Sequence, residues 1–119
     1  MIFLVEDDDA TRDAIRLMLE CEGLVVSAFS SCDALCGLVD PKAADCLILD
    51  VHMRGMTGID LLEQIRNEGG RQPIIMMTGL PTPGLEARAA AAGAFAVLEK
   101  PFKASYLIET VTRALAVGG

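Results

Sequence analysis

The stretch that decides the fold is Cys46-Leu47-Ile48-Leu49-Asp50, in which four apolar residues end in a single carboxylate. Residues 57–60, Thr-Gly-Ile-Asp, then open a helical pattern. A short apolar run followed by a helix is typical of a strand that is buried on both faces of a parallel sheet. Such strands end at the edge where α/β proteins bind their ligands. We therefore expect Asp50 at the C-terminal tip of a central strand, with its side chain reaching into a crevice.

The rest of the chain repeats this alternation of strand and helix. Apolar strands are expected at 2–5, 24–29, 46–50, 73–78 and 95–98. Helices are expected from 9 to about 22, 34–39, 57–68, 84–92 and from 103 onward. Asp8 or Asp9 should cap the first helix, residues 30–33 (Ser-Ser-Cys-Asp) are a cap signal for the second, and Thr82 should cap the fourth. Thr57 and Asp60 have the spacing of a capping box at the start of the third, with Asp in place of Glu. Every crossover is long enough to hold a helix. The pattern therefore predicts an α/β fold with a doubly wound, five-stranded parallel sheet and five helices.

The bulk composition limits the classes of protein that fit. A chain of 119 residues, 52% of them hydrophobic, fits one domain spanning residues 1–119. No apolar run approaches the length of a membrane span, and the first residues lack the basic leader of a signal peptide, so we expect a cytoplasmic protein. The net charge of −7 and the pI near 4.5 argue against direct binding to nucleic acid or to an anionic membrane. They suit a cation or a basic partner.

The cysteines do not indicate a zinc site, because the spacing of Cys21, Cys32, Cys36 and Cys46 fits no zinc-ligand pattern. Cys32 and Cys36 lie one helical turn apart, which leaves a metal or redox pair open. We expect all four to be small buried side chains in a reducing compartment.

Polar residues stand at the ends of four expected strands: Glu6-Asp7, Asp50, Thr78 and Lys100. Parallel strands end on one edge, so these side chains should converge there. Three carboxylates in one pocket repel unless one takes up a proton or a cation enters, and all-oxygen ligands suit Mg²⁺. A phosphoryl group on Asp50 would meet Mg²⁺, the Lys100 ammonium and the Thr78 hydroxyl. This is the charge neutralisation that phosphoryl transfer to a carboxylate requires.

Five short motifs lie in order along the whole chain. Val5-Glu6-Asp7-Asp8, Leu49-Asp50-Val51-His52-Met53, Met56-Thr57-Gly58, Met77-Thr78-Gly79 and Glu99-Lys100-Pro101-Phe102 together resemble the motif set of response-regulator receiver domains. The sequence around Asp50 and Lys100 is most similar to receivers of nitrogen-fixation and LuxR-type regulators. The resemblance implies a flavodoxin-like fold, as in CheY-like receivers, with strand order 2-1-3-4-5.

The resemblance also assigns roles to individual residues. Asp50 would be the phosphoacceptor, and Mg²⁺ would be held by Glu6, Asp7, Asp50 and the backbone carbonyl of His52, with Asp7 the more direct ligand of the first pair. Two further residues complete the implied site. Thr78 would be the switch hydroxyl and Lys100 the phosphate-binding lysine, with Pro101 after it in a cis peptide bond.

The chain departs from the family pattern at three points. Arg54 stands where family members often have proline, so the loop after Asp50 should be more mobile. Val97 stands where the family usually has the aromatic ring that turns inward on activation. Leu80 and His52 occupy positions whose side chains influence access of water to the phosphoryl group, so we expect them to affect the lifetime of the modified state.

The resemblance implies a two-component signalling protein rather than an enzyme. A histidine kinase or phosphotransfer protein would donate the phosphoryl group, which would later be hydrolysed in the same site. Phosphorylation would reshape the face formed by the fourth helix, fifth strand and fifth helix. This face would then contact an output domain, a separate partner protein or a second copy in a homodimer.

Two alternatives stay open. One is a degenerate receiver that only binds a partner protein, which Val97 leaves possible. The other is a Mg²⁺-dependent phosphatase with an aspartate nucleophile, although His52 stands where such enzymes have a second acid.

Overall fold

The computed structural model describes residues 1–118 and contains a five-stranded parallel sheet in the order β2-β1-β3-β4-β5. This is the order implied by the resemblance, which the structure confirms. The strands are β1 (Ile2–Val5), β2 (Val26–Phe29), β3 (Cys46–Asp50), β4 (Ile74–Thr78) and β5 (Ala96–Glu99).

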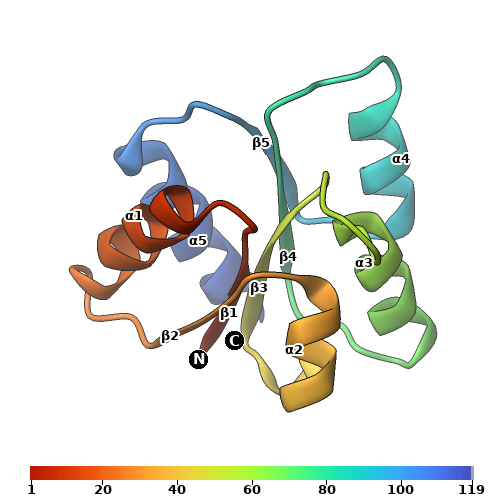
Figure 1. The fold of residues 1–119 in the computed structure, drawn as a ribbon, viewed down its shortest axis with the longest axis horizontal. Coiled ribbons are helices and arrows are strands. Elements are labelled where there is room, and N and C mark those ends of the chain that lie inside the picture. The colour runs from red at the N-terminus through yellow and green to blue at the C-terminus, as the bar shows by residue number, and fades with distance from the viewer. Residues whose placement is uncertain (119) are drawn as a thin grey trace.

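Helices cover both faces of the sheet (Figure 1). One face carries α1 (Asp9–Glu20) and α5 (Ala104–Gly118). The other carries α2 (Cys32–Leu38), α3 (Gly58–Asn67) and α4 (Leu85–Ala92), with a single turn of 3₁₀ helix, η1 (Pro41–Ala43), leading into β3. No helix within residues 1–118 combines the length and the apolar character needed to cross a membrane.

Alternation along the strands divides the core into two layers. On β1, Ile2 and Leu4 pack towards α1 and α5, whereas Phe3 and Val5 pack towards α2 and α3. The middle strand, β3, is buried at every residue, because helices lie on both of its faces. The continuous apolar run that precedes Asp50 is therefore a consequence of burial on both sides.

Short polar side chains begin three of the helices as the sequence predicts. Asp8 accepts a hydrogen bond from the Thr11 amide at 2.8 Å and thereby caps α1. Ser31 caps α2 in the same way. Thr57 and Asp60 form a reciprocal capping box at the start of α3, as their spacing predicted.

The predicted start of α4 was wrong. Thr82 does not cap the helix with its side chain; its backbone carbonyl instead accepts from the Leu85 amide at 3.1 Å. Gly84 adopts a left-handed conformation with φ +81°, which interrupts the helical path, so α4 begins at Leu85 and its first turn has no side-chain cap.

Other element ends also differ from their predicted positions. Strand β2 starts at Val26 rather than residue 24, because it pairs in register with a four-residue β1 that begins at Ile2. Strand β5 covers residues 96–99 rather than 95–98, since its pairing to β4 starts at Ala96. Helix α1 ends at Glu20, two residues before the predicted end.

The far end of α4 is tied to α3 through one arginine. Arg66 donates from Nη1 to the carbonyls of Gly70 and Gln72, at 3.1 and 2.9 Å. Its Nη2 donates to the carbonyl of Gly93, the residue that ends α4, at 2.7 Å. One guanidinium thus joins the C-terminal ends of two helices and the entry to β4.

The cysteines are all free, and they differ in burial. Cys32 and Cys46 are buried, and this burial raises the pKa of each thiol to about 12. Cys36 is half-buried, whereas Cys21 is exposed in the turn after α1, so the prediction of burial was wrong for Cys21.

Candidate functional site

The register of the sheet brings the polar strand ends together. Val5 lies opposite Leu49, so the residues that follow, Glu6 and Asp50, emerge side by side from β1 and β3. On the other side, Asp50 pairs with Met77, and Thr78 pairs with Glu99, the residue before Lys100.

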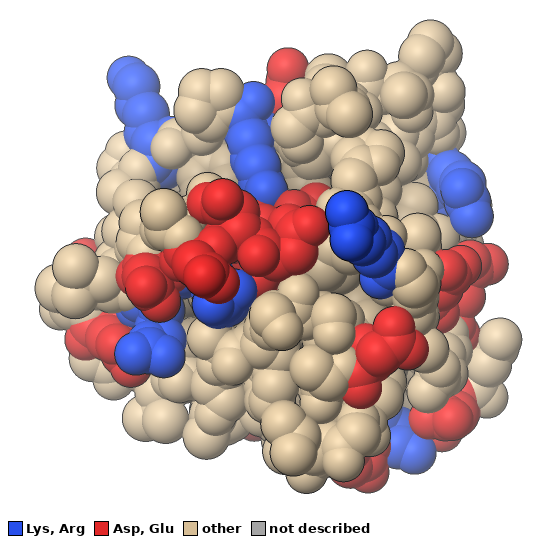
Figure 2. Space-filling model, in the orientation of Figure 1, with Lys and Arg blue, Asp and Glu red and all other residues tan. Residues whose placement is uncertain are grey.

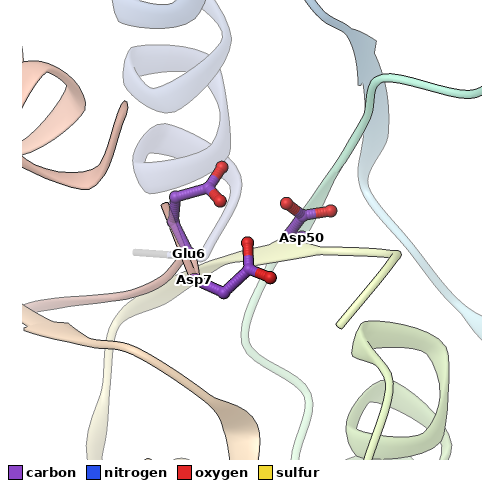
Figure 3. Close-up of side chains that lie close together, drawn as sticks. All are labelled: Glu6, Asp7 and Asp50. Carbon is purple, nitrogen blue, oxygen red and sulfur yellow. The ribbon is translucent and has the colours of Figure 1, made fainter. Parts of the chain in front are cut away.

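Three carboxylates form one acidic cluster at this edge, consisting of Glu6, Asp7 and Asp50, with ligand oxygens that all lie within 4.8 Å of one another. Figure 3 shows the Asp7 carboxylate projecting towards the tip of β3, where Asp50 stands. Glu6 and Asp50 are only 1% and 5% exposed, whereas Asp7 is exposed. Acidic atoms gather on the same face where β1 leads into α1 (Figure 2). The cluster is therefore buried at its base and open to solvent at Asp7.

The Lys100 ammonium joins two of these carboxylates. Its Nζ lies 2.8 Å from Asp50 Oδ2 and also donates to Glu6 Oε1. Burial alone would lower the pKa of Lys100, but hydrogen bonds and charges of both acids outweigh it, so that this pKa is raised. Burial raises the pKa of Glu6, and sharing the ammonium with Asp50 compensates only part of that effect.

The donor set fits a hard divalent cation. Three carboxylates and one ammonium leave two negative charges uncompensated, which is the charge that a divalent ion neutralises. All the side-chain donors are oxygens, and exposed Asp7 leaves an open side for coordinated water.

His52 makes two contacts at the site, one through its backbone amide and one through its imidazole, and neither was predicted from the sequence. Its backbone amide donates to Asp50 Oδ1 at 3.0 Å, so the two oxygens of Asp50 have different partners. Its exposed imidazole reaches across to the Leu80 carbonyl, with Nε2 3.3 Å from that oxygen. A backbone donor leaves no signal in residue type, whereas the family resemblance did single out the positions of His52 and Leu80.

Thr78 is buried at the tip of β4, but its hydroxyl is engaged within its own loop. Oγ1 accepts from the Leu80 amide at 3.1 Å, and this is the hydrogen bond that the structure gives to that hydroxyl. Beside it lies a hollow of about 430 Å³, lined among others by Thr78, Leu85 and the half-buried Val97. The valine thus leaves open space next to the residue that was expected to be the switch. The Lys100–Pro101 peptide bond is cis, as expected.

The chain is similar to known proteins over nearly its whole length. The family model described as response regulator receiver domain matches residues 2–112. The transcriptional regulatory protein FixJ of Azorhizobium caulinodans is 33% identical over 114 residues, covering 96% of this chain and 54% of FixJ. The response regulator protein TodT of Pseudomonas putida is 34% identical over 115 residues, covering 97% of this chain and 51% of TodT. The chain therefore spans about half the length of these curated relatives.

Solved structures agree with this similarity. The structure titled FixJ-N superposes with a TM-score of 0.85 at 28% identity, covering 97% of this chain and 92% of that one. A CheY-like receiver domain protein from Methanospirillum hungatei superposes with a TM-score of 0.90 at 26% identity, covering 98% and 94%. Together with the acidic cluster around Asp50, these matches show that the chain belongs to the response regulator receiver domain family of two-component signalling proteins.

Proposed function

We propose that this domain accepts a phosphoryl group on Asp50 from the phosphohistidine of a histidine kinase or phosphotransfer protein. The observation that carries the proposal is the double contact of Lys100 with Glu6 and Asp50 beside exposed Asp7. This arrangement supports the proposal because one positive charge lies against Asp50, while exposed Asp7 leaves the acidic cluster accessible to a cation.

In the transfer step, a carboxylate oxygen of Asp50 attacks phosphorus while the phosphorus–nitrogen bond to the donor histidine breaks. The electron pair of that bond returns to the imidazole, and the product is an acyl phosphate. Glu6, Asp7, Asp50 and the His52 carbonyl would hold Mg²⁺, which would supply charge neutralisation for the phosphoryl oxygens. Lys100 already contacts Asp50 Oδ2 and supplies the second positive charge.

Two hydrogen bonds keep the Asp50 carboxylate oriented. The His52 amide and the Lys100 ammonium hold the two oxygens of Asp50, so the carboxylate has a fixed direction before the donor arrives. Attack by water on the acyl phosphate in the same pocket would return the domain to its starting state.

The signal would leave the site through Thr78. The Thr78 hydroxyl accepts from the Leu80 amide, and its own proton is available to donate to a phosphoryl group. Movement of Thr78 towards that group would pull on Leu80 through this contact. The resulting change in the β4–α4 loop would bias the face formed by α4, β5 and α5, which would contact an output domain, a partner protein or a second copy. Because FixJ is named a transcriptional regulatory protein and is about twice as long, control of transcription in a longer parent protein is the output we favour.

A binding-only receiver is the second candidate, favoured by Val97 and by the engagement of Thr78 with its own loop. Such a domain would present the same α4–β5–α5 face without being modified.

Incubation with phosphoramidate or acetyl phosphate and Mg²⁺, followed by intact-mass measurement, tests the proposal. The wild-type domain should gain one phosphoryl group, and Asp50→Asn should gain none. Asp45→Asn, which changes an exposed acid next to β3, is the matched control and should be modified like the wild type. Absence of any addition would support the binding-only receiver, and steady turnover of phosphate esters would support an aspartate phosphatase.

A further inference from the structure

The loop between β3 and α3, residues 51–57, is held in part by helix α2. Asp33, in the first turn of α2, accepts a hydrogen bond from the Met56 amide through Oδ2 at 3.3 Å. The neighbouring Cys32 thiol lies 3.8 Å from the Thr57 carbonyl. Two consecutive residues of α2 therefore contact two consecutive residues at the end of this loop.

The Asp33 carboxylate also packs against Gly55. A Cβ atom at Gly55 would lie 2.5 Å from Asp33 Oδ2, and Gly55 itself adopts a left-handed conformation with φ +74°. The loop thus makes its turn directly beneath Asp33, where only a glycine fits.

The start of the same loop is held by the site. The His52 amide donates to Asp50, so the segment is tied to the phosphoacceptor at one end and to α2 at the other. Between these ties, Arg54 is exposed and no proline restricts the backbone. The loop that contains His52 is therefore held at both of its ends.

We propose that Asp33 is a positioning residue for metal binding: from α2 it holds the β3–α3 loop in the shape that presents the His52 carbonyl to Mg²⁺. The inference rests on the proposed function, because it requires that this carbonyl is a ligand. Asp33 itself acts only through the Met56 amide and Gly55. Its role is that of an outer-shell group that orients a ligand.

Two substitutions separate the hydrogen bond from the charge. Asp33→Asn and Asp33→Ala both remove the negative charge, but asparagine keeps an oxygen that accepts from the Met56 amide. In metal-free protein, hydrogen exchange at the Met56 amide, followed by NMR, should be faster in Asp33→Ala than in Asp33→Asn. The dissociation constant for Mg²⁺, measured by calorimetric titration, should be roughly fivefold higher in Asp33→Ala than in Asp33→Asn, as expected for the loss of one neutral backbone hydrogen bond.

The rate of modification by phosphoramidate provides a third measurement. In Asp33→Ala the Mg²⁺ concentration needed for half of the maximal rate should rise, while the maximal rate at saturating Mg²⁺ stays close to that of Asp33→Asn. Asp13→Ala, which removes an exposed acid on α1, controls for the general loss of negative charge. Urea unfolding of each variant controls for a change in global stability.

Equal Mg²⁺ affinity in Asp33→Ala and Asp33→Asn would overturn the inference, whether or not exchange at Met56 differs. Failure of the wild-type domain to bind Mg²⁺ at all would instead overturn the proposed function. The two failures are therefore distinguishable.

Discussion

At the scale of single residues, the ionised form of the Glu6 carboxylate is less stable in the folded state than in the unfolded state. This carboxylate is buried beside Asp50, and one lysine serves both acids. Because burial raises the pKa of Glu6, the folded state holds a proton at this group more tightly than the unfolded state. The stability that Glu6 contributes is therefore full below the pKa of an unfolded glutamate, about 4.3, and is lost as pH rises through the folded-state value.

Replacing Glu6 by glutamine should remove this pH-dependent loss of stability. In metal-free buffer, we expect the free energy of unfolding of Glu6→Gln, relative to wild type, to increase as pH rises from about 4 to 7, since only the wild type ionises there. Urea unfolding at several pH values measures the difference. Glu22→Gln, an exposed glutamate in the turn after α1, should show no such trend. A difference that stays constant with pH would mean that Lys100 fully compensates the Glu6 charge.

The convergence of the acids and Lys100 could be predicted from single residues, because each of these side chains stands at the end of an apolar strand. Backbone groups could not, since every residue carries the same amide. The donation from His52 to Asp50 and that from Met56 to Asp33 depend on loop conformations that residue type does not specify.

At the scale of the elements, the start of α3 is fitted tightly against β3. A Cβ atom at Gly58 would overlap the Asp50 carbonyl oxygen and would lie 2.8 Å from Met76 Cε. The absence of a side chain at this position lets the first turn of α3 pack directly on the strand that carries Asp50.

Gly58→Ala should therefore lower the free energy of unfolding, by about 1–3 kcal/mol as for other overpacked sites, even though alanine favours helix. Gly37→Ala is the matched control: Gly37 lies in α2, and a Cβ there would meet nothing within 4 Å. That variant should be stabilised by up to about 1 kcal/mol. Urea unfolding of both variants checks the pair, and equal effects would contradict the close packing at Gly58.

The element boundaries show where local signals stop being sufficient. Asp8, Ser31 and Thr57 cap their helices as predicted, because each side chain bonds an amide a few residues away. The Thr82-Pro83 pair carries the same local signal, but the left-handed turn at Gly84 shifts the helix beyond it. Pairing between strands, a long-range effect, likewise moved the starts of β2 and β5.

For the molecule as a whole, the proposed cation site in the acidic cluster would link folding to metal binding. An ion that binds only the folded state stabilises it, by about 2.7 kcal/mol at a concentration one hundred times the dissociation constant. We expect MgCl₂ to raise the free energy of unfolding of the wild type and to have a much smaller effect on Asp7→Asn. NaCl at matched ionic strength is the control, and an equal rise with both salts would indicate screening rather than a site.

The topology was predictable in part from physics. Parallel strands require long crossovers, and every connection in this chain is long enough to hold a helix. Parallel strands place their ends on one edge, so convergence of the polar strand ends followed from the pattern. The order 2-1-3-4-5 came from the family resemblance, because several orders satisfy the same alternation.

The arginine tie at the end of α4 has a mechanical consequence. Arg66 anchors the helix at Gly93, while the opposite end begins at an uncapped glycine turn near Thr78. A helix fastened at one end swings about that pivot instead of sliding along its axis. A movement of α4 that starts at the tip of β4 should therefore be largest at Leu85 and smallest towards Ala92.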